Sequence, residues 1–118
     1  MTKYSKAYIY GIKCNKTGLL YIGSSMEPMN IRLRKHLTDM NGYLGLNKKT
    51  RAYRSSFEVL FNEEYDMFKI EDYPCETKHE LEVREGLHML RNPHCVNKRL
   101  PCKLNREVYD LSSLPSLI

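Results

Sequence analysis

The sequence predicts an α+β domain built on a β-hairpin that carries tyrosines, with helices and a third strand after it. Two stretches of alternating apolar side chains, over residues 7–14 and 19–24, flank the turn-type segment Asn15-Lys16-Thr17-Gly18. A third alternating stretch covers residues 67–73, and elsewhere the apolar residues recur at helical spacing. A chain of 118 residues has room for one domain with a single modest core.

The turn sets the register of the hairpin. A four-residue loop places Tyr10 opposite Gly23 and Ile12 opposite Tyr21, so that the two tyrosines are diagonal neighbours. Because Gly23 has no side chain, we expect two phenol hydroxyls beside a gap that a non-protein group can enter. The alternative is that these aromatic residues only stabilise the hairpin by packing. The residues that share this face are Tyr8, Tyr10, Tyr21 and Gly23.

A helix is expected from Met29 to about Met40, because Pro28 suits the first helical position. Arg32 and His36 are four residues apart and therefore share a face of this helix. That face lies beside the buried stripe, so their polar tips reach the edge of the core while their stems stay covered. The buried stripe consists of Leu33, Leu37 and Met40.

The middle of the chain is expected to form a loop, a second helix and a third strand. Glycine and asparagine residues over 41–49 indicate the loop. The helix is expected over about Lys49 to Asn62. The strand follows over Met67 to Tyr73, where alternation predicts that Phe68 and Ile70 are buried.

A third helix is expected from a capping box, Thr77 followed by Glu80, to about Arg91. Glu85 falls on a different side from the core stripe of this helix, between apolar residues. A carboxylate in such surroundings needs a partner, because an unpaired buried charge is costly. A metal ion or a nearby base would serve, and so would a lysine or arginine at the rim. The core stripe consists of Val83, Leu87 and Leu90.

Basic residues are concentrated in two stretches of the chain and acidic residues in a third, on a net charge of +5. Residues 32–54 hold seven Lys or Arg and one acid, residues 91–106 hold five and no acid, and residues 58–85 hold ten acids and three bases. This segregation favours a DNA or RNA backbone as partner over a solvated surface of mixed charge. The candidate substrate-binding residues are Gly23, Lys35, Lys48, Lys49, Arg51 and Arg54.

No apolar run approaches the roughly 20 residues of a membrane-spanning helix, and no secretory signal is visible, so we expect an intracellular protein with no membrane partner. The four cysteines form neither a CxxC pair nor a regular framework, which favours buried thiols. Zinc would need an unfamiliar ligand spacing. The residues open to that interpretation are Cys75 with His79, and His94 and Cys95 with Cys102.

Five motifs together resemble those of the GIY-YIG nuclease family, in matching order and spacing over roughly residues 7–98. They are Tyr8-Ile9-Tyr10, Tyr21-Ile22-Gly23, Arg32-x-x-x-His36, Glu85 and Asn97. The departure is Tyr8, where the family usually has glycine, a change expected to alter packing at the margin of the site and not the chemistry. The resemblance implies a small central three-stranded antiparallel sheet flanked by helices, and metal-dependent hydrolysis of a phosphodiester.

The chemistry of that reaction suggests a role for each residue. Mg²⁺ prefers oxygen ligands and keeps several waters, so Glu85 alone suffices to hold it, with Mn²⁺ as a possible substitute. The planar fork of Arg32 suits two phosphate oxygens. Tyr10 or Tyr21 orients or deprotonates the attacking water, and a phenol, with its ordinary pKa of about 10, needs a cationic neighbour to act as a base. His36 hydrogen-bonds a tyrosine, either to relay a proton or to order the ring.

Asn97 is expected to pin the segment after the last helix by hydrogen bonds to backbone. The nuclease domain is expected over residues 1–105, with 106–118 as a C-terminal appendage. Little chain remains for reading sequence, so specificity would come from the basic segment 48–54, a homodimer, an accessory protein, or DNA shape such as branches and flaps. The alternatives are a non-catalytic nucleic-acid-binding module and an RNA-directed nuclease.

Overall fold

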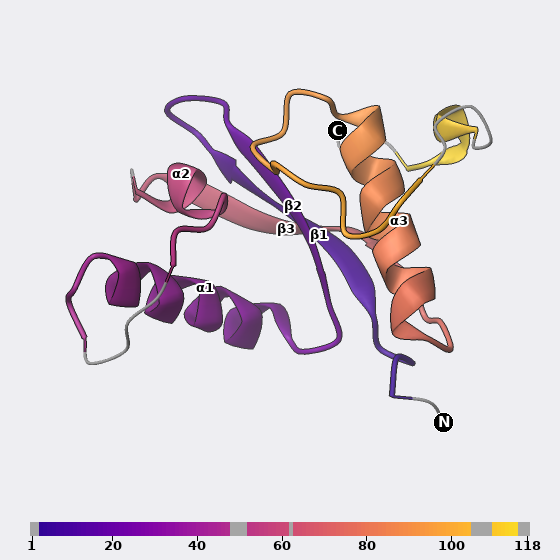
Figure 1. Ribbon diagram of the computed structural model, residues 1–118, viewed down its shortest axis with the longest axis horizontal. Helices are drawn as coiled ribbons and strands as arrows, with labels where there is room; N and C mark the ends of the chain where they lie inside the picture. The colour runs from indigo at the N-terminus through magenta and orange to yellow at the C-terminus, as the bar shows by residue number, and fades with distance from the viewer. Residues whose placement is uncertain (1–2, 48–51, 62, 105–109, 116–118) are drawn as a thin grey trace.

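A three-stranded antiparallel sheet lies between two helical layers (Figure 1). The computed structural model describes residues 3–47, 52–61, 63–104 and 110–115. The central strand is β1 (Tyr8–Cys14), with β2 (Leu20–Ser25) and β3 (Tyr65–Asp72) paired antiparallel on either side of it. The predicted fold class is therefore confirmed, and β2 and β3 are the two edge strands of the sheet.

The hairpin has the predicted register. Tyr10 pairs with Gly23 and Ile12 with Tyr21. Gly18 closes the turn with a φ of 78°, in the left-handed region that glycine adopts without strain. The diagonal relation between the two tyrosines follows directly from this pairing.

The central strand is buried on both faces and separates two hydrophobic cores. On one face it is covered by α1 (Met29–Tyr43) and α2 (Phe57–Leu60), and on the other by α3 (Lys78–Arg91). The first core contains Tyr8, Tyr10, Ile12, Cys14, Met40, Phe57, Val59 and Leu60. The second contains Ala7, Ile9, Ile22, Cys75, Leu81 and Met89. Alternation along the strands thus sends successive side chains toward different helices.

The two long helices begin where the sequence predicts. The first begins at Met29 but continues to Tyr43, one turn beyond its predicted end at Met40. At the start of α3, Thr77 accepts a hydrogen bond from the Glu80 N–H at 3.2 Å. This is the capping contact that the sequence pattern predicts.

The second helix is much shorter than predicted. Residues 52–54 are not helical and α2 is a single turn, while 48–51 and 62 lie outside the described residues. Ser56 directly precedes α2, and its buried hydroxyl makes no capping hydrogen bond that would favour a longer helix. The predicted start at Lys49 also lies outside the described residues.

Two predictions of buried residues are corrected. In β3, Phe68 and Ile70 are only half-buried, because this strand is an edge of the sheet. In α3, Leu87 is buried as predicted, but Val83 and Leu90 are half-buried. The helix packs against the sheet on one side and the C-terminal segment on another, which rotates and widens its buried face. The residues buried there are Leu81, Gly86, Leu87, His88 and Met89.

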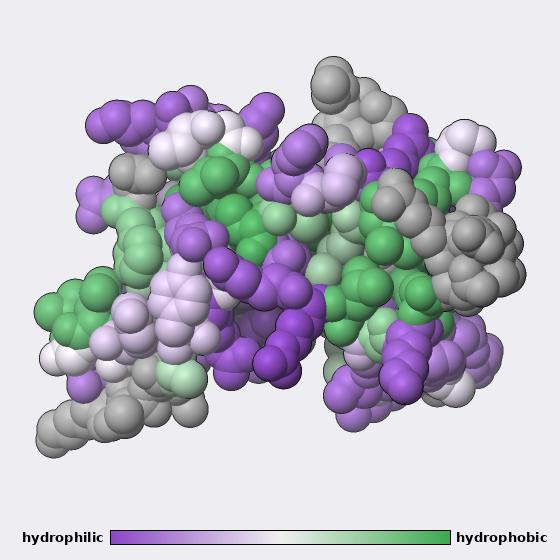
Figure 2. Space-filling model, turned by 45° about the horizontal axis from the view of Figure 1, so that its top comes forward, coloured by the Kyte–Doolittle hydropathy of each residue, from purple (hydrophilic) through white to green (hydrophobic). Residues whose placement is uncertain are grey.

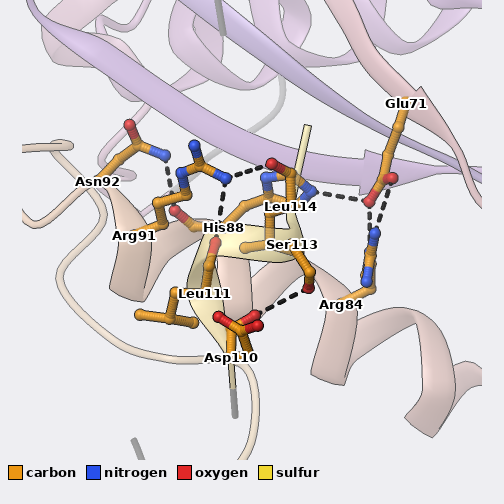
Figure 3. Close-up of polar contacts among 9 residues, drawn as sticks. All are labelled: Glu71, Arg84, His88, Arg91, Asn92, Asp110, Leu111, Ser113 and Leu114. Carbon is orange, nitrogen blue, oxygen red and sulfur yellow. Dashed lines mark hydrogen bonds and ion pairs between the residues drawn. The ribbon is translucent and has the colours of Figure 1, made fainter. Parts of the chain in front are cut away.

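Residues 110–115 lie against α3. The Arg91 guanidinium donates hydrogen bonds to the carbonyls of Leu111 and Leu114, and the Leu114 side chain is buried (Figure 3). The division of the chain into 1–105 and 106–118 stays a prediction. Within the described part of the chain, no helix has the length and apolar composition needed to cross a bilayer.

Candidate active site

Two tyrosines of the hairpin and a histidine of α1 form an aromatic cluster on the α1 face of the sheet. The Tyr10 hydroxyl and His36 Nε2 are hydrogen-bonded at 2.6 Å in a buried contact. The rings of Tyr21 and His36 meet edge to face with centroids 5.5 Å apart, and those of Tyr10 and Tyr21 are 6.3 Å apart. His36 is fully buried, deeper than the edge-of-core position predicted for it, because it lies beneath both tyrosines.

The gap predicted beside Gly23 does not exist. A Cβ at this position would lie 2.5 Å from the Cζ and Oη of Tyr10, so the tyrosine ring itself fills the space. Gly23 is buried, which places it below the phenol and away from an open binding surface. Tyr10 is also fully buried, whereas Tyr21 is partly exposed. Only one of the two phenols therefore reaches solvent.

The three side chains of the aromatic cluster are uncharged at neutral pH. Burial, together with the charges of Arg32 and Arg54, lowers the pKa of His36 to about 3, so its ring is neutral at pH 7. Burial also raises the pKa of Tyr10 and of Tyr21, and the Arg32 guanidinium offsets only part of that effect. Both phenols therefore hold their protons at neutral pH.

Glu85 projects from α3 toward β2. The Ser24 hydroxyl donates a hydrogen bond to its Oε1 at 2.5 Å. Burial raises the pKa of the Glu85 carboxyl, and the bond from Ser24 opposes that shift. Among the described residues Glu85 makes no ion pair, so the rim lysine or arginine considered from the sequence is not found there.

The two halves of the site meet at the outer edge of β2. Odd-numbered residues of this strand face α1 and even-numbered residues face α3, so Tyr21 and Glu85 approach the edge from opposite faces. Both line a cleft of about 560 Å³. Ser24 and Arg32 line a neighbouring cavity of about 330 Å³. The Arg32 charge lowers the pKa of both tyrosines and of Glu85, in opposition to the effect of burial.

Asn97 covers the edge of β2. Its side-chain oxygen accepts a hydrogen bond from the Ile22 N–H at 2.9 Å, and its amide donates to the Ile22 carbonyl at 2.6 Å. The Val96 N–H donates to the Leu20 carbonyl at 2.8 Å. The hydrogen bonds to backbone that the sequence predicts are present. They tie the segment after α3 to the strand that carries Tyr21, and satisfy groups that an edge strand leaves unpaired.

Cations from two distant segments line the cleft. Arg54 precedes α2, and Lys98 and Arg99 directly follow Asn97. Sequence reasoning included the last two only in a basic stretch, although their position after Asn97 was the signal that could have placed them. It also missed Ser24, which directly follows the Tyr21-Ile22-Gly23 motif. Figure 2 shows hydrophilic residues gathered across the middle of one face of the molecule, between hydrophobic regions.

The other predicted basic residues lie elsewhere. Lys35 pairs with Glu27 at 2.7 Å on the surface and lines neither of the two cavities. No three His, Cys, Asp or Glu residues in the described ranges are grouped to hold a metal ion, so the zinc interpretation gains no support. The remaining predicted phosphate contacts, Lys48, Lys49 and Arg51, lie outside the described residues.

Tyr8 packs at the margin of the cluster, as expected for its departure from the motif. Its ring centroid is 6.1 Å from that of Tyr10, and its hydroxyl donates to the Glu27 carbonyl at 2.5 Å. The Lys69 ammonium lies 5.5 Å from the centroid of its ring. The extra tyrosine thus links the hairpin to the residue that precedes Pro28 and α1.

A sequence model of the GIY-YIG catalytic domain matches residues 6–85, which is more than half of the chain. The chain belongs to the GIY-YIG family. Proteins of this family are endonucleases and typically depend on a metal ion. The match ends at Glu85, so Asn97 is placed at the site by its hydrogen bonds alone. Searches of curated proteins and of solved structures gave no match.

The GIY-YIG site fits a hard divalent cation. Its donor at the cleft is the Glu85 carboxylate, which makes no ion pair among the described residues and accepts a hydrogen bond from the Ser24 hydroxyl. Both groups are oxygens, which Mg²⁺ and Mn²⁺ prefer over nitrogen and sulfur. The open cleft leaves room for the waters that such an ion retains.

Proposed function

We propose that this GIY-YIG protein is a Mg²⁺-dependent endonuclease that hydrolyses DNA phosphodiester bonds. The observation that supports this is a carboxylate that makes no ion pair among the described residues, Glu85, which lines one cleft together with the partly exposed phenol of Tyr21. The three bases that line this cleft favour an anionic polymer, and the Glu85 carboxylate offers an oxygen ligand to a metal ion.

Each side chain has a task that its position suits. Arg54, Lys98 and Arg99 bind the DNA backbone along the cleft. The fork of Arg32 stabilises the negative charge that develops on the phosphate in the transition state. A metal ion held by Glu85 would polarise the phosphate and neutralise the departing oxygen.

We assign the attacking water to Tyr21 and a positioning role to Tyr10. Tyr21 is the phenol with an exposed edge in the cleft, and it retains its proton, so it orients water by hydrogen bonding. Tyr10 is buried against His36, and this pair fixes the floor on which Tyr21 rests. Asn97 holds the backbone of β2 next to Tyr21.

The test is nicking of supercoiled plasmid with Mg²⁺ or with a chelator. Wild-type protein and the control variant Glu76→Gln, altered at an exposed residue before α3, are expected to nick only with the metal, whereas Glu85→Gln is not. Nicking by Glu85→Gln at the wild-type rate would overturn the assignment of the metal ligand. Cleavage of RNA without DNA would indicate an RNA-directed nuclease, and salt-sensitive binding without any cleavage would indicate a binding module.

A further inference from the structure

A second aromatic cluster lies beside the cleft and has no part in the chemistry above. Phe57 is buried at its centre, and the rings of Tyr43, Tyr53 and Phe61 surround it with centroids 5.5, 5.7 and 6.2 Å from its own. The outer three are exposed by 44, 42 and 43 %. Aromatic rings with this much free surface are available to a ligand.

The exposed ring of Tyr53 is held in its orientation from two sides. It meets Tyr43 edge to face at 5.4 Å and 71°, and Phe57 at 5.7 Å and 83°. An exposed ring that is already ordered loses little conformational entropy when a flat ligand stacks on it.

Tyr53 also lines the active-site cleft, in the same space as Glu85. Arg54 follows it in the chain, and Lys98 and Arg99 contribute further positive charge to this cleft. A π-surface next to a row of cations is the combination with which proteins bind single-stranded nucleic acid, because bases stack on the ring while phosphates meet the charges.

We propose that Tyr53 is a stacking platform for an unpaired base, and that the preferred substrate is DNA with a flap, gap or frayed end beside the scissile phosphate. This inference rests on the proposed function, since it takes the polymer in the cleft to be nucleic acid. In a continuous duplex the bases are stacked on one another, so Tyr53 has no base to bind. An unpaired base therefore adds affinity that intact duplex cannot supply.

The positive charge beside Tyr53 favours nucleic acid over a second copy of the chain as the ligand of this surface. The cleft next to Tyr53 presents Arg54, Lys98 and Arg99, and a second copy docked with the same face would bring identical charges against them. Like charges across an interface are unfavourable, whereas a phosphate backbone complements them.

The experiment measures binding by fluorescence anisotropy, in chelator, of a labelled flap duplex and a continuous duplex of the same sequence. Tyr53→Ala is expected to weaken flap binding by roughly 5- to 150-fold, the range for losing one base stack, while duplex binding stays unchanged. Tyr53→Phe keeps the ring and should bind like wild type. Phe61→Ala removes an exposed ring that does not line the cleft, and should also leave both affinities unchanged.

An abasic scan of the flap tests the same point with wild-type protein, so it does not depend on whether a variant folds. Removing the base at one position should weaken wild-type binding by the same factor, and should have no effect on Tyr53→Ala. The proposal is overturned if no position matters, if Tyr53→Ala loses affinity for both DNAs equally, or if sedimentation shows that this variant disrupts a dimer.

The readout separates this inference from the proposed function, because binding is measured without cleavage. If binding prefers the flap through Tyr53 but no cleavage follows the addition of Mg²⁺, the stacking role of Tyr53 is supported and the proposed nuclease activity is rejected. Metal-dependent cleavage with equal affinity for flap and duplex would support the nuclease activity and reject the stacking role of Tyr53.

Discussion

Glu71, which contacts α3, and Glu85, which belongs to α3, have different hydrogen-bond and ion-pair partners. Glu71 of β3 is held by two side chains of α3 (Figure 3): Arg84 Nη2 donates to it at 2.9 Å, and His88 Nε2 lies 2.8 Å from its Oε1. Glu85 has a hydrogen bond from the Ser24 hydroxyl and no ion pair among the described residues. One carboxylate thus stabilises the fold through ion pairs, and the other makes no ion pair among the described residues and remains available to a ligand.

The pKa shifts of the two carboxyls have opposite signs. Burial raises the pKa of Glu71, but the hydrogen bonds from Arg84 and His88 outweigh it and bring the net pKa below the ordinary value. Burial raises the pKa of Glu85, and the bond from Ser24 does not reverse that shift. The difference teaches that the acid at the cleft, unlike the acid of β3, is not stabilised in its charged form by the fold, which is typical of a functional carboxylate.

The largest effect should come from Glu85→Gln. We expect cleavage to fall by about 10³-fold or more, because the one carboxylate that the described residues place at the cleft is lost. Thermal stability should be unchanged or higher, since an unbalanced buried charge is removed. Plasmid nicking and thermal unfolding followed by circular dichroism measure the two quantities. A marked loss of stability would show that Glu85 is a structural residue like Glu71.

The next effect is that of Arg32→Lys, which keeps the charge and removes the planar fork. We expect the cleavage rate to fall by about 10²-fold while DNA affinity stays nearly unchanged. Arg34→Lys, on an exposed face of the same helix, is the matched control. Equal losses of rate and affinity in Arg32→Lys would make this arginine an anchor for the backbone only.

Glu71→Gln should lower stability and leave cleavage unchanged, which is the opposite of the result expected for Glu85→Gln. Loss of the negative charge leaves Arg84 and His88 without their partner, so the free energy of unfolding should fall by about 1–3 kcal/mol. Cleavage per folded molecule should be unchanged. Urea unfolding and nicking measure both, and a cleavage defect that persists in fully folded protein would contradict the separation of the two faces of α3.

The pH dependence of these two variants should have opposite signs. Because the pKa of Glu71 is lowered, its contribution is present above the ordinary value of 4.5 and is lost as the pH falls through the folded pKa, so wild type and Glu71→Gln should converge in acid. Because the pKa of Glu85 is raised, its ionisation disfavours folding as the pH rises above 4.5, so Glu85→Gln should gain on wild type there. Urea midpoints across this range would show parallel curves if neither carboxyl is shifted.

The smallest effect is expected from Ser24→Ala. Without the hydroxyl, the pKa of Glu85 should rise further, so the acid limb of the cleavage pH profile should move to higher pH with only a few-fold loss at the optimum. Ser24→Thr keeps a hydroxyl and should restore the profile. A uniform loss at every pH would mean that Ser24 acts on the fold and not on the charge of Glu85.

Local rules made much of the fold predictable. The length of the turn gave the hairpin register, Pro28 marked the start of α1, and Thr77 marked the start of α3. The five motifs of the family were also visible in the sequence. The turn and the helix starts depend on residues close together in the chain, and the family resemblance depends on the order and spacing of short motifs.

Several other contacts between distant segments were not predictable. Whether the space over Gly23 is open depends on the rotamer of Tyr10, which the pairing alone does not specify. The partner of Glu85 depends on how α3 is rotated against β2, and the place of Lys98 depends on the pairing of Asn97 with that strand. Each of these is set by packing across the sheet.

The most direct measurement is Mn²⁺ binding to metal-free protein, followed by the electron paramagnetic resonance of the free ion. We predict that wild type and Glu71→Gln bind Mn²⁺ with the same affinity, and that Glu85→Gln has lost this site. Undiminished binding by Glu85→Gln would contradict the claim that this carboxylate holds the metal.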